Sequence, residues 1–336
     1  MILCLSHTQD FYTIDIVQKQ LQALGKDVYR LNSDLFSHCL SFDYGHNEDG
    51  SFSFELKTGD RTFCSKEVEA VWYRKLWHIT PPPELDSDYH RIFYQEYQTM
   101  RDIFFDALAH VPWMNNMPRD HHIAGNKALQ LQLAAKSGLE VPRTLMTNHS
   151  ERLGDFFYSV CKGQMIAKLH GSLSRSMSGS GAFLPTTQVR EADLGRLETL
   201  PYCPMIFQEL IPKQYELRVI YVAGEIFAGK IDTRASIQSQ TDWRAANDIA
   251  AAWATYTLPG DVCKGIDSMM QEMGLLFGAL DIMRHTDGRY IFLEVNPQGE
   301  WGMLQRDLGY PIGEAIAAEL VARTATKNKN AARLTI

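Results

Sequence analysis

Two acidic residues and an asparagine lie inside apolar stretches near the C-terminal end of the sequence. Asp281 belongs to the run at 278–283, and Glu294 and Asn296 belong to the run at 292–297. Successive side chains of a strand point to opposite faces, so Glu294 and Asn296 would share one face. Carboxylate and amide oxygens are ligands that Mg²⁺ prefers, and an incomplete shell leaves positions for water and for the phosphates of a nucleotide. The pattern predicts a metal and nucleotide site; the alternative is that these are ordinary polar residues of a half-exposed hairpin.

A β-hairpin is the element expected to position these residues. The turn sequence His-Thr-Asp-Gly at 285–288 separates the two apolar runs, and such a turn between strand-like segments is typical of a hairpin. An unpaired carboxylate in an apolar segment costs several kcal/mol unless a cation or another partner compensates it. The setting of Asp281 and Glu294 therefore favours the metal site.

A second hairpin is expected in the middle of the chain. Strand-like runs at 215–222 and 225–231 flank an Ala-Gly pair, which is a hairpin signal. Glu216 and Arg218 alternate onto one face of the first strand, and Lys230 lies on its partner. This charged face could be solvated or could line a nucleotide site.

Two lysines stand where they could bind phosphates. Lys127 falls in the first turns of a helix expected from about 121 to 136, and the N-terminal end of a helix favours anions. Lys168 lies in an apolar strand at 165–169, where an anionic ligand could compensate its charge. The Gly- and Ser-rich stretch at 171–181 follows; it could close over phosphates or be a plain loop.

Composition limits the classes of function. The chain has 336 residues, of which 45% are hydrophobic, so it can bury a sizeable core in two or three domains. A formal net charge of -7 argues against a non-specific nucleic-acid binder. We expect no transmembrane span and no secretion signal, and hence a cytoplasmic protein. The six cysteines show no CxxC spacing, which argues against a structural zinc site and a disulfide framework.

The order of predicted elements indicates an α/β beginning. A strand at 2–6, a helix at 12–24 and a strand at 28–31 form a parallel unit. A hairpin at 40–44 and 51–56 follows, and residues 112–116 are interpreted as a linker. Further helices are expected at 88–109, 151–161, 242–255, 264–277 and 313–323.

This order of elements resembles the ATP-grasp superfamily over most of the chain. The resemblance implies a mixed α/β and α+β fold with an N-terminal α/β domain at 1–115, a central lid-like domain at 116–205 and a C-terminal nucleotide and metal lobe at 206–336. It also implies ATP and Mg²⁺ as the bound nucleotide and metal.

The resemblance assigns roles to individual residues. Lys127 and Lys168 match the superfamily's phosphate-binding lysines, and Arg218 matches the arginine that faces the γ-phosphate. Residues 207–211 match the hinge beside adenine. The remaining matches are Gln208, Glu209 and Leu210 at the adenine edge, Glu216 as a ribose contact, and Asp281, Glu294 and Asn296 as magnesium ligands.

Within the superfamily the sequence is similar to the microviridin-type peptide-maturation ligases, also called graspetide synthetases. The supporting segments are 71–75, 113–115, 126–131 and 141–148. The similarity implies that an Asp or Glu side chain of a ribosomally made precursor peptide becomes an acyl phosphate and is attacked by a Thr or Ser hydroxyl or a Lys amine. The alternatives are a ligase that adds a free amino acid to a protein or small acid, a small-molecule kinase, and a nucleotide-binding protein without turnover.

The position of Arg234 after the second hairpin suggests one contact with the peptide, and the same similarity implies a further one with its leader. Arg234 could bind the substrate carboxylate or be a surface arginine. A leader segment of the precursor would be recognised at about 231–255, with Trp243, Arg244 and Trp253 as candidates and helix-core packing as the stronger alternative for the tryptophans. A homodimer is also implied, and the aromatic helix near Tyr94 could form its interface.

Overall fold

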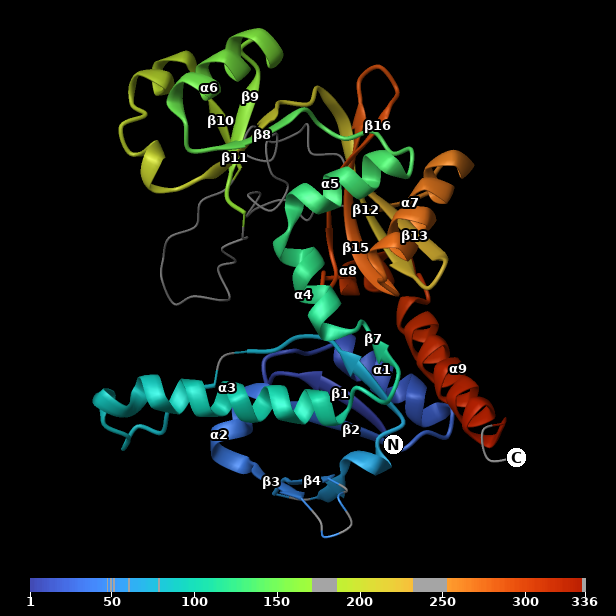
Figure 1. Cartoon of the computed structure of the whole chain (residues 1–336). Helices are drawn as coiled ribbons and strands as arrows, with labels where there is room; N and C mark the ends of the chain where they lie inside the picture. Colours follow the sequence, from blue (N-terminus) through green and yellow to red (C-terminus); the bar gives the residue numbers. More distant parts are fainter. Residues whose placement is uncertain are drawn as a thin grey trace. The chain divides into compact units, whose positions relative to one another are not determined.

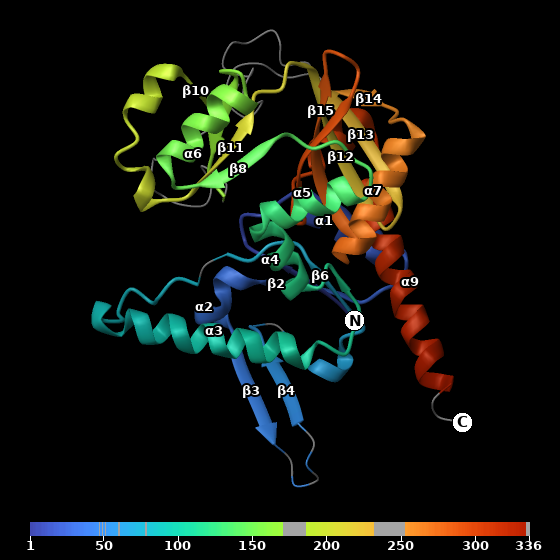
Figure 2. The same cartoon turned by 45° about the horizontal axis from the view of Figure 1, so that its top comes forward.

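The fold is taken from a computed structural model of the whole chain, which describes residues 1–46, 48, 50, 52–59, 61–77, 79–170, 186–231 and 253–333, and the side chains of all of these except 38, 39 and 326–333. Internal contacts divide the chain into two compact units. The first comprises 1–118, 300–305 and 311–336, and the second comprises 119–299 and 306–310. Figures 1 and 2 show the helices and strands of each unit.

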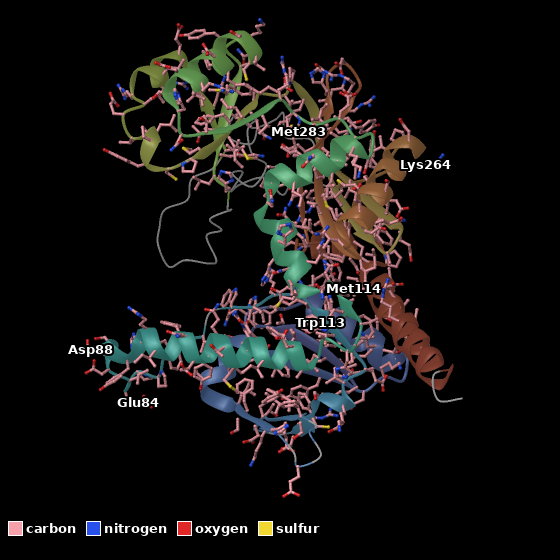
Figure 3. All side chains as sticks on the ribbon, viewed as in Figure 1. Glu84, Asp88, Trp113, Met114, Lys264 and Met283 are labelled. Atoms are coloured by element: carbon pink, nitrogen blue, oxygen red, sulfur yellow. The ribbon has the colours of Figure 1, made fainter. Side chains whose placement is uncertain are left out.

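The first unit is built on a parallel four-stranded sheet. Its order is β2 (Val28–Asn32), β1 (Ile2–Ser6), β6 (Ala70–Tyr73) and β7 (Trp113–Met114). The sheet is parallel because α1 (Thr13–Ala23) connects β1 to β2, as the apolar spacing of the sequence predicts. Figure 3 labels Trp113 and Met114 on β7. The interpretation of this segment as a linker was therefore wrong: Val71 and Trp72 pair with it.

A small antiparallel sheet and a long helix complete the core of the first unit. The sheet consists of β3 (Ser41–His46), β4 (Phe52–Lys57) and β5 (Thr62–Cys64), which confirms the expected hairpin. Phe104 and Phe105 of α3 (His90–Ala107) pack in one apolar cluster with residues of both sheets. Helix α9 (Ile312–Arg333) packs on α1. The short elements are α2 (Phe36–Cys39) and the 3-10 turns Ser33–Leu35, Ser65–Glu67 and Ser87–Tyr89.

The second unit contains an antiparallel five-stranded sheet. Its order is β14 (Ala254–Tyr256), β13 (Glu225–Ile231), β12 (Lys213–Val222), β15 (Phe277–His285) and β16 (Tyr290–Asn296). Both predicted hairpins are confirmed. Ala223 and Gly224 have φ values of 47° and 105°, and two consecutive positive φ values fit the tight turn between β12 and β13.

Helices cover one face of this sheet. α5 (Lys127–Lys136) and α7 (Gly260–Met273) share an apolar cluster with alternate residues of the strands, including Leu217, Leu280 and Val295. Met283 pairs with Glu216 on the opposite face, and Figure 3 shows Met283 on the side away from α7, which carries Lys264. The other helices of this unit or at its boundaries are α4 (Met117–Gly125) and α8 (Gly302–Leu308).

Several predicted helices differ from the structure. The helix expected at 264–277 is wrong at its end, because α7 ends at Met273 and Phe277 begins β15, and the helix expected at 313–323 continues as α9 to Arg333. The helix expected at 121–136 is interrupted, because Asn126 leaves the helical conformation (φ -112°, ψ 78°) and its side chain accepts a hydrogen bond from the Leu129 N–H as the N-cap of α5. The helix expected at 242–255 is wrong at its end, where 254–256 is strand β14 paired with β13. Residues 242–252 lie outside the described residues.

A separate four-stranded sheet lies in the same unit. Its order is β10 (Thr187–Val189), β9 (Met165–Lys168), β11 (Met205–Glu209) and β8 (Thr144–Thr147). α6 (Ser150–Asp155) continues into a π-helical turn at Phe156–Val160 and packs on one face of this sheet. Glu191–Gly195 and Leu200–Tyr202 are 3-10 turns. The division into three domains stays a prediction; α5, at the start of the predicted lid, packs against β16.

No helix among the described residues is long and apolar enough to cross a membrane.

Candidate active site

The three predicted metal ligands share one face of the β15–β16 hairpin. Asp281 pairs directly with Glu294, and a register shift follows between Asp281 and Ile282. The Asn296 amide N–H donates to the Glu294 carboxylate over 3.3 Å. Their neighbours Leu280 and Val295 belong to the buried cluster under the helices, so alternation sends the three polar side chains to the other face.

Arg218 is brought onto this face by the central strand. It pairs with Asp281 across β12 and β15, and its Nη1 donates to the Asp281 Oδ1 over 2.7 Å. The two side chains are only 5% and 11% exposed. A pair this buried is held by charge-assisted hydrogen bonding, so the guanidinium has a defined position next to the predicted metal ligands.

Lys127 reaches the same face from the first residue of α5. Its Nζ lies 2.9 Å from the Glu294 Oε2. The helix is fixed to β16 by Gln130, which is fully buried: its amide donates to the Val295 carbonyl over 3.0 Å and accepts from the Val295 N–H over 3.0 Å. Gln130 was missed as a positioning residue, and its only signal in the sequence is an amide among the leucines of the helix.

Glu216 lies two residues before Arg218 on the same face of β12. It forms an ion pair with Lys213, and both side chains are at most 10% exposed. Lys213 was not predicted as part of the site. Lys230, in contrast, pairs with Leu217 and so points to the other face, where its Nζ lies 4.2 Å from the centre of the Tyr215 ring. The prediction that groups Lys230 with Glu216 and Arg218 does not hold.

The predicted hinge, residues 207–211, contains the last residues of strand β11 and the two residues after it. The Gln208 amide donates to the Thr144 Oγ1 over 2.8 Å. The N–H groups of Glu209 and Leu210 donate to the carbonyls of Arg143 and Gln164, over 3.1 and 2.9 Å. Since these donors are engaged, contacts of Glu209 and Leu210 with a base would use their carbonyl oxygens.

Arg143 stabilises this hinge from the preceding strand connection. Its Nε and its backbone N–H donate to the two oxygens of Glu209 over 2.7 and 2.8 Å. This hydrogen bond to Glu209 raises the pKa of the Arg143 guanidinium. The pair holds the end of β11 against the start of β8.

Lys168 is the last residue of β9 and pairs with Ile206. Phe207 belongs to the apolar cluster under α6, so Lys168 and Gln208 lie on the sheet face away from that helix. The stretch 171–181 and the candidates Arg234, Trp243 and Arg244 lie outside the described residues. Trp253 is described and half-buried.

The donor set fits a nucleotide-bound magnesium ion. Two carboxylates and an amide oxygen on adjacent strand positions are hard ligands but leave the coordination shell incomplete. Within the described residues no group of three or more His, Cys, Asp and Glu side chains could hold a metal. A metal held by these three ligands would have coordination positions left for other oxygen atoms, and the neighbouring cations suit phosphates.

Comparison with known families decides the assignment. Residues 124–320 match the model described as RimK-like ATP-grasp domain, and residues 1–121 match the MvdD pre-ATP grasp domain. The chain belongs to the RimK-like ATP-grasp family. The predicted superfamily and fold are thereby confirmed, and the chain is an ATP-grasp ligase by family.

Solved structures extend this likeness over almost the whole ligase. Macrocyclase MdnB from Microcystis aeruginosa MRC is 37% identical, with 95% of this chain and 98% of MdnB covered and a TM-score of 0.81. Macrocyclase MdnC from the same organism, bound with precursor peptide MdnA, is 30% identical, with 96% and 99% covered and a TM-score of 0.83. Both confirm the predicted likeness to microviridin-type ligases.

A third structure carries a nucleotide as well as peptide. A Chryseobacterium gregarium RiPP-associated ATP-grasp ligase in complex with ADP, and a leader and core peptide, is 27% identical to this ligase, with 96% of each chain covered and a TM-score of 0.88. A comparison with curated proteins found no match.

Proposed function

We propose that this ligase uses ATP to join side chains within a ribosomally made precursor peptide. An Asp or Glu side chain would be activated and joined to a Thr or Ser hydroxyl, giving an ester, or to a Lys amine, giving an amide, so that a ring closes. The observation that carries the proposal is the sheet face on which Arg218 and Lys127 alternate with Asp281 and Glu294. The likeness to macrocyclases MdnB and MdnC supports peptide as the substrate class.

Polar residues of this face and of strands β9 and β11 would bind the nucleotide and its metal. Asp281, Glu294 and Asn296 would hold Mg²⁺, which when bound neutralises phosphate charge and orients the γ-phosphoryl group. Lys127 and Lys168 would bind phosphate oxygens, and Glu216 the ribose. Gln208, Glu209 and Leu210 would border the adenine, with the carbonyls of Glu209 and Leu210 as acceptors for its amino group.

The reaction needs activation because a carboxylate is a poor electrophile. A carboxylate oxygen of the peptide attacks the γ-phosphorus, the bond from this phosphorus to the β–γ bridging oxygen breaks, and ADP leaves. The hydroxyl or amine then attacks the acyl carbon, loses its proton, and phosphate leaves with the carboxylate oxygen. Arg218 suits the charge that develops on the transferring group, because its fork of donors is fixed by Asp281.

The proposal extends to partners of the ligase. The precursor would supply a leader, bound at about 231–255 with Trp243, Arg244 and Trp253 as candidates, and a core whose carboxylate Arg234 could bind. We propose a homodimer in the cytoplasm, where ATP and a new peptide are both present, without nucleic-acid or membrane partners. The exposed residues Tyr89, Ile92 and Tyr94 near the start of α3 are candidates for the dimer contact.

One experiment tests the reaction. The protein is incubated with ATP, Mg²⁺ and a precursor peptide encoded nearby, and peptide mass and ADP are followed. Loss of one water per bond together with ADP supports the proposal, whereas a gain of phosphate indicates a kinase and a gain of an amino acid indicates the other ligase. An unchanged peptide without ADP contradicts it and indicates a binding protein.

Variants connect that reaction to the site. Glu294→Ala and Asn296→Ala should abolish turnover, and retained activity would refute the metal assignment. Glu225→Ala, at the exposed start of β13, is the matched control because it removes an exposed carboxylate from the same sheet at a distance from the site: Glu225 pairs with Val222, four residues along β12 from Arg218.

A further inference from the structure

A tight turn follows the proposed metal ligand Asn296. The Gly299 N–H donates to the Asn296 carbonyl over 2.9 Å, which closes a four-residue turn directly after β16. Proline at the second position and glycine at the fourth are typical of such a turn. Gly299 does not have a positive φ, so backbone conformation does not explain why glycine stands there.

Lack of space for a side chain explains why glycine stands at position 299. A Cβ atom at position 299 would collide with the Cβ of Ala279, would lie 2.9 Å from the Nη2 of Arg218, and would lie 3.1 Å from the Asn296 carbonyl oxygen. Ala279 belongs to β15, which is paired on both sides, and the carbonyl belongs to the turn itself, so neither moves alone. The guanidinium is the group that can yield.

Arg218 is therefore bonded on one side and closely approached by the turn on the other. Its Nη1 donates to Asp281 over 2.7 Å, and its Nη2 faces Gly299. The turn has an anchor of its own, because the Gln298 amide donates over 2.5 Å to Asp120 of α4, which is fully buried. An anchored turn cannot retreat from the guanidinium when a methyl group is added.

We propose that the turn Asn296–Gly299 positions Arg218 for transfer of the phosphoryl group, with Gly299 providing the space for the guanidinium and the Gln298–Asp120 bond holding the turn. Gly299 and Gln298 are positioning residues that act through Arg218. This inference rests on the proposed function for its consequence in catalysis, but the contact between Gly299 and Arg218 can be tested without turnover.

The chain offers a matched control for Gly299→Ala. A Cβ at Gly278 would also be too close to its neighbours, at 2.7 Å from Val295 Cγ2 and 2.8 Å from Met270 Cε. These atoms belong to the apolar cluster on the other face of the sheet. Gly278→Ala therefore overpacks the same sheet without touching Arg218.

The two variants should differ in turnover and not in stability. We expect both variants to lower the melting temperature by roughly 2–10 °C. Only Gly299→Ala should lower kcat for ADP formation with ATP, Mg²⁺ and precursor peptide, by about 10- to 100-fold relative to Gly278→Ala, with KM for ATP within about threefold. Equal kcat values for the two variants would overturn the proposal.

A second substitution separates packing from the arginine contact. Ala279→Gly removes the colliding methyl group, so the double variant with Gly299→Ala should recover stability but keep the low kcat, because the contact with Arg218 remains. Full recovery of kcat would refute the role of the guanidinium. Asp120→Asn, which keeps an oxygen acceptor for Gln298, should retain more kcat than Asp120→Ala.

The last measurement needs no substrate. In an Arg218→Ala background, Gly299→Ala should lower the melting temperature less than in the unaltered protein, because one of its clashes is gone. Equal shifts in the two backgrounds would show that position 299 does not contact Arg218. If the unaltered protein forms no ADP with any peptide, the proposed function fails, while this comparison still decides the contact.

Discussion

The buried pair between Arg218 and Asp281 predicts opposite outcomes for single and double replacement. Asp281→Leu leaves a guanidinium that is 5% exposed without the carboxylate 2.7 Å away, and Arg218→Met leaves the carboxylate without its cation. Each single variant should be strongly destabilised. The double variant removes both charges and places apolar side chains of similar volume next to each other, so it should regain most of the lost stability.

The expected size follows from the burial of the pair. Breaking a buried ion pair from one side costs about 3–5 kcal/mol, whereas replacing both partners by apolar groups is near neutral. Both side chains have further interactions, so we expect about 3 kcal/mol for each single variant. For a folding unit of about 150–250 residues, this corresponds to a fall in melting temperature of roughly 6–12 °C.

The assay combines thermal unfolding with ADP formation. The two single variants and the double variant should all lack turnover with precursor peptide, while only the single variants lose stability. A melting temperature of Asp281→Leu within about 2 °C of the unaltered protein would refute the buried pair. A double variant whose loss equals the sum of the single losses would refute the coupling.

Three more predictions concern single residues. Lys127→Met should raise the Kd for ATP about tenfold or more in calorimetric titrations, because a charge-assisted bond worth about 1.5–3 kcal/mol is lost; an unchanged Kd would contradict the phosphate role. Glu300→Gln should destabilise the first unit by about 1–3 kcal/mol in urea titrations, because Arg74, 2% exposed, loses a carboxylate 2.7 Å away; Gln would have to leave stability unaltered for this to fail. Burial raises the pKa of the Cys4 thiol to about 12, so its contribution to stability is complete below the unfolded pKa of about 8.5 and is lost as pH rises from there toward 12. Iodoacetamide at about pH 9 should then label exposed Cys203 but not Cys4, and equal labelling by mass spectrometry would refute the shift.

Local patterns explain why both hairpins of the second unit could be predicted. Alternation along a strand and the chemistry of a tight turn act over a few residues. Glu294 and Asn296 therefore fall on one face in the sequence and in the structure. The direct pairing of Asp281 with Glu294 depends on the register of the two strands. An irregularity between Asp281 and Ile282 changes this register, so the turn sequence alone does not predict the pairing.

Contacts between distant segments could not be predicted in the same way. Asn126 ends one helix and caps the next because its side chain accepts a hydrogen bond from Leu129, whereas apolar spacing alone runs through it. Residues 254–256 form a strand because they pair with β13. This pairing between distant segments outweighs the helical spacing of the apolar residues in the sequence. Lys213 and Gln130 contribute to the site through partners that only the fold reveals.

The alternation of cations and acids on the site face has a physical reason. Three ion pairs form on this face: Lys127 with Glu294, Arg218 with Asp281, and Lys213 with Glu216. Carboxylates gathered there alone would repel each other and would be costly to bury, and so would the cations. The proposed ligands are a divalent cation and a polyphosphate, so the face must present both negative and positive side chains. Without ligand these side chains neutralise each other in ion pairs, and with ligand each turns to the opposite charge of the metal or the phosphates. No buried charge is then left uncompensated in the free or the bound protein. Removing a cation and removing an acid should therefore both weaken binding of magnesium and ATP, and removing a whole pair should impair binding far more than stability.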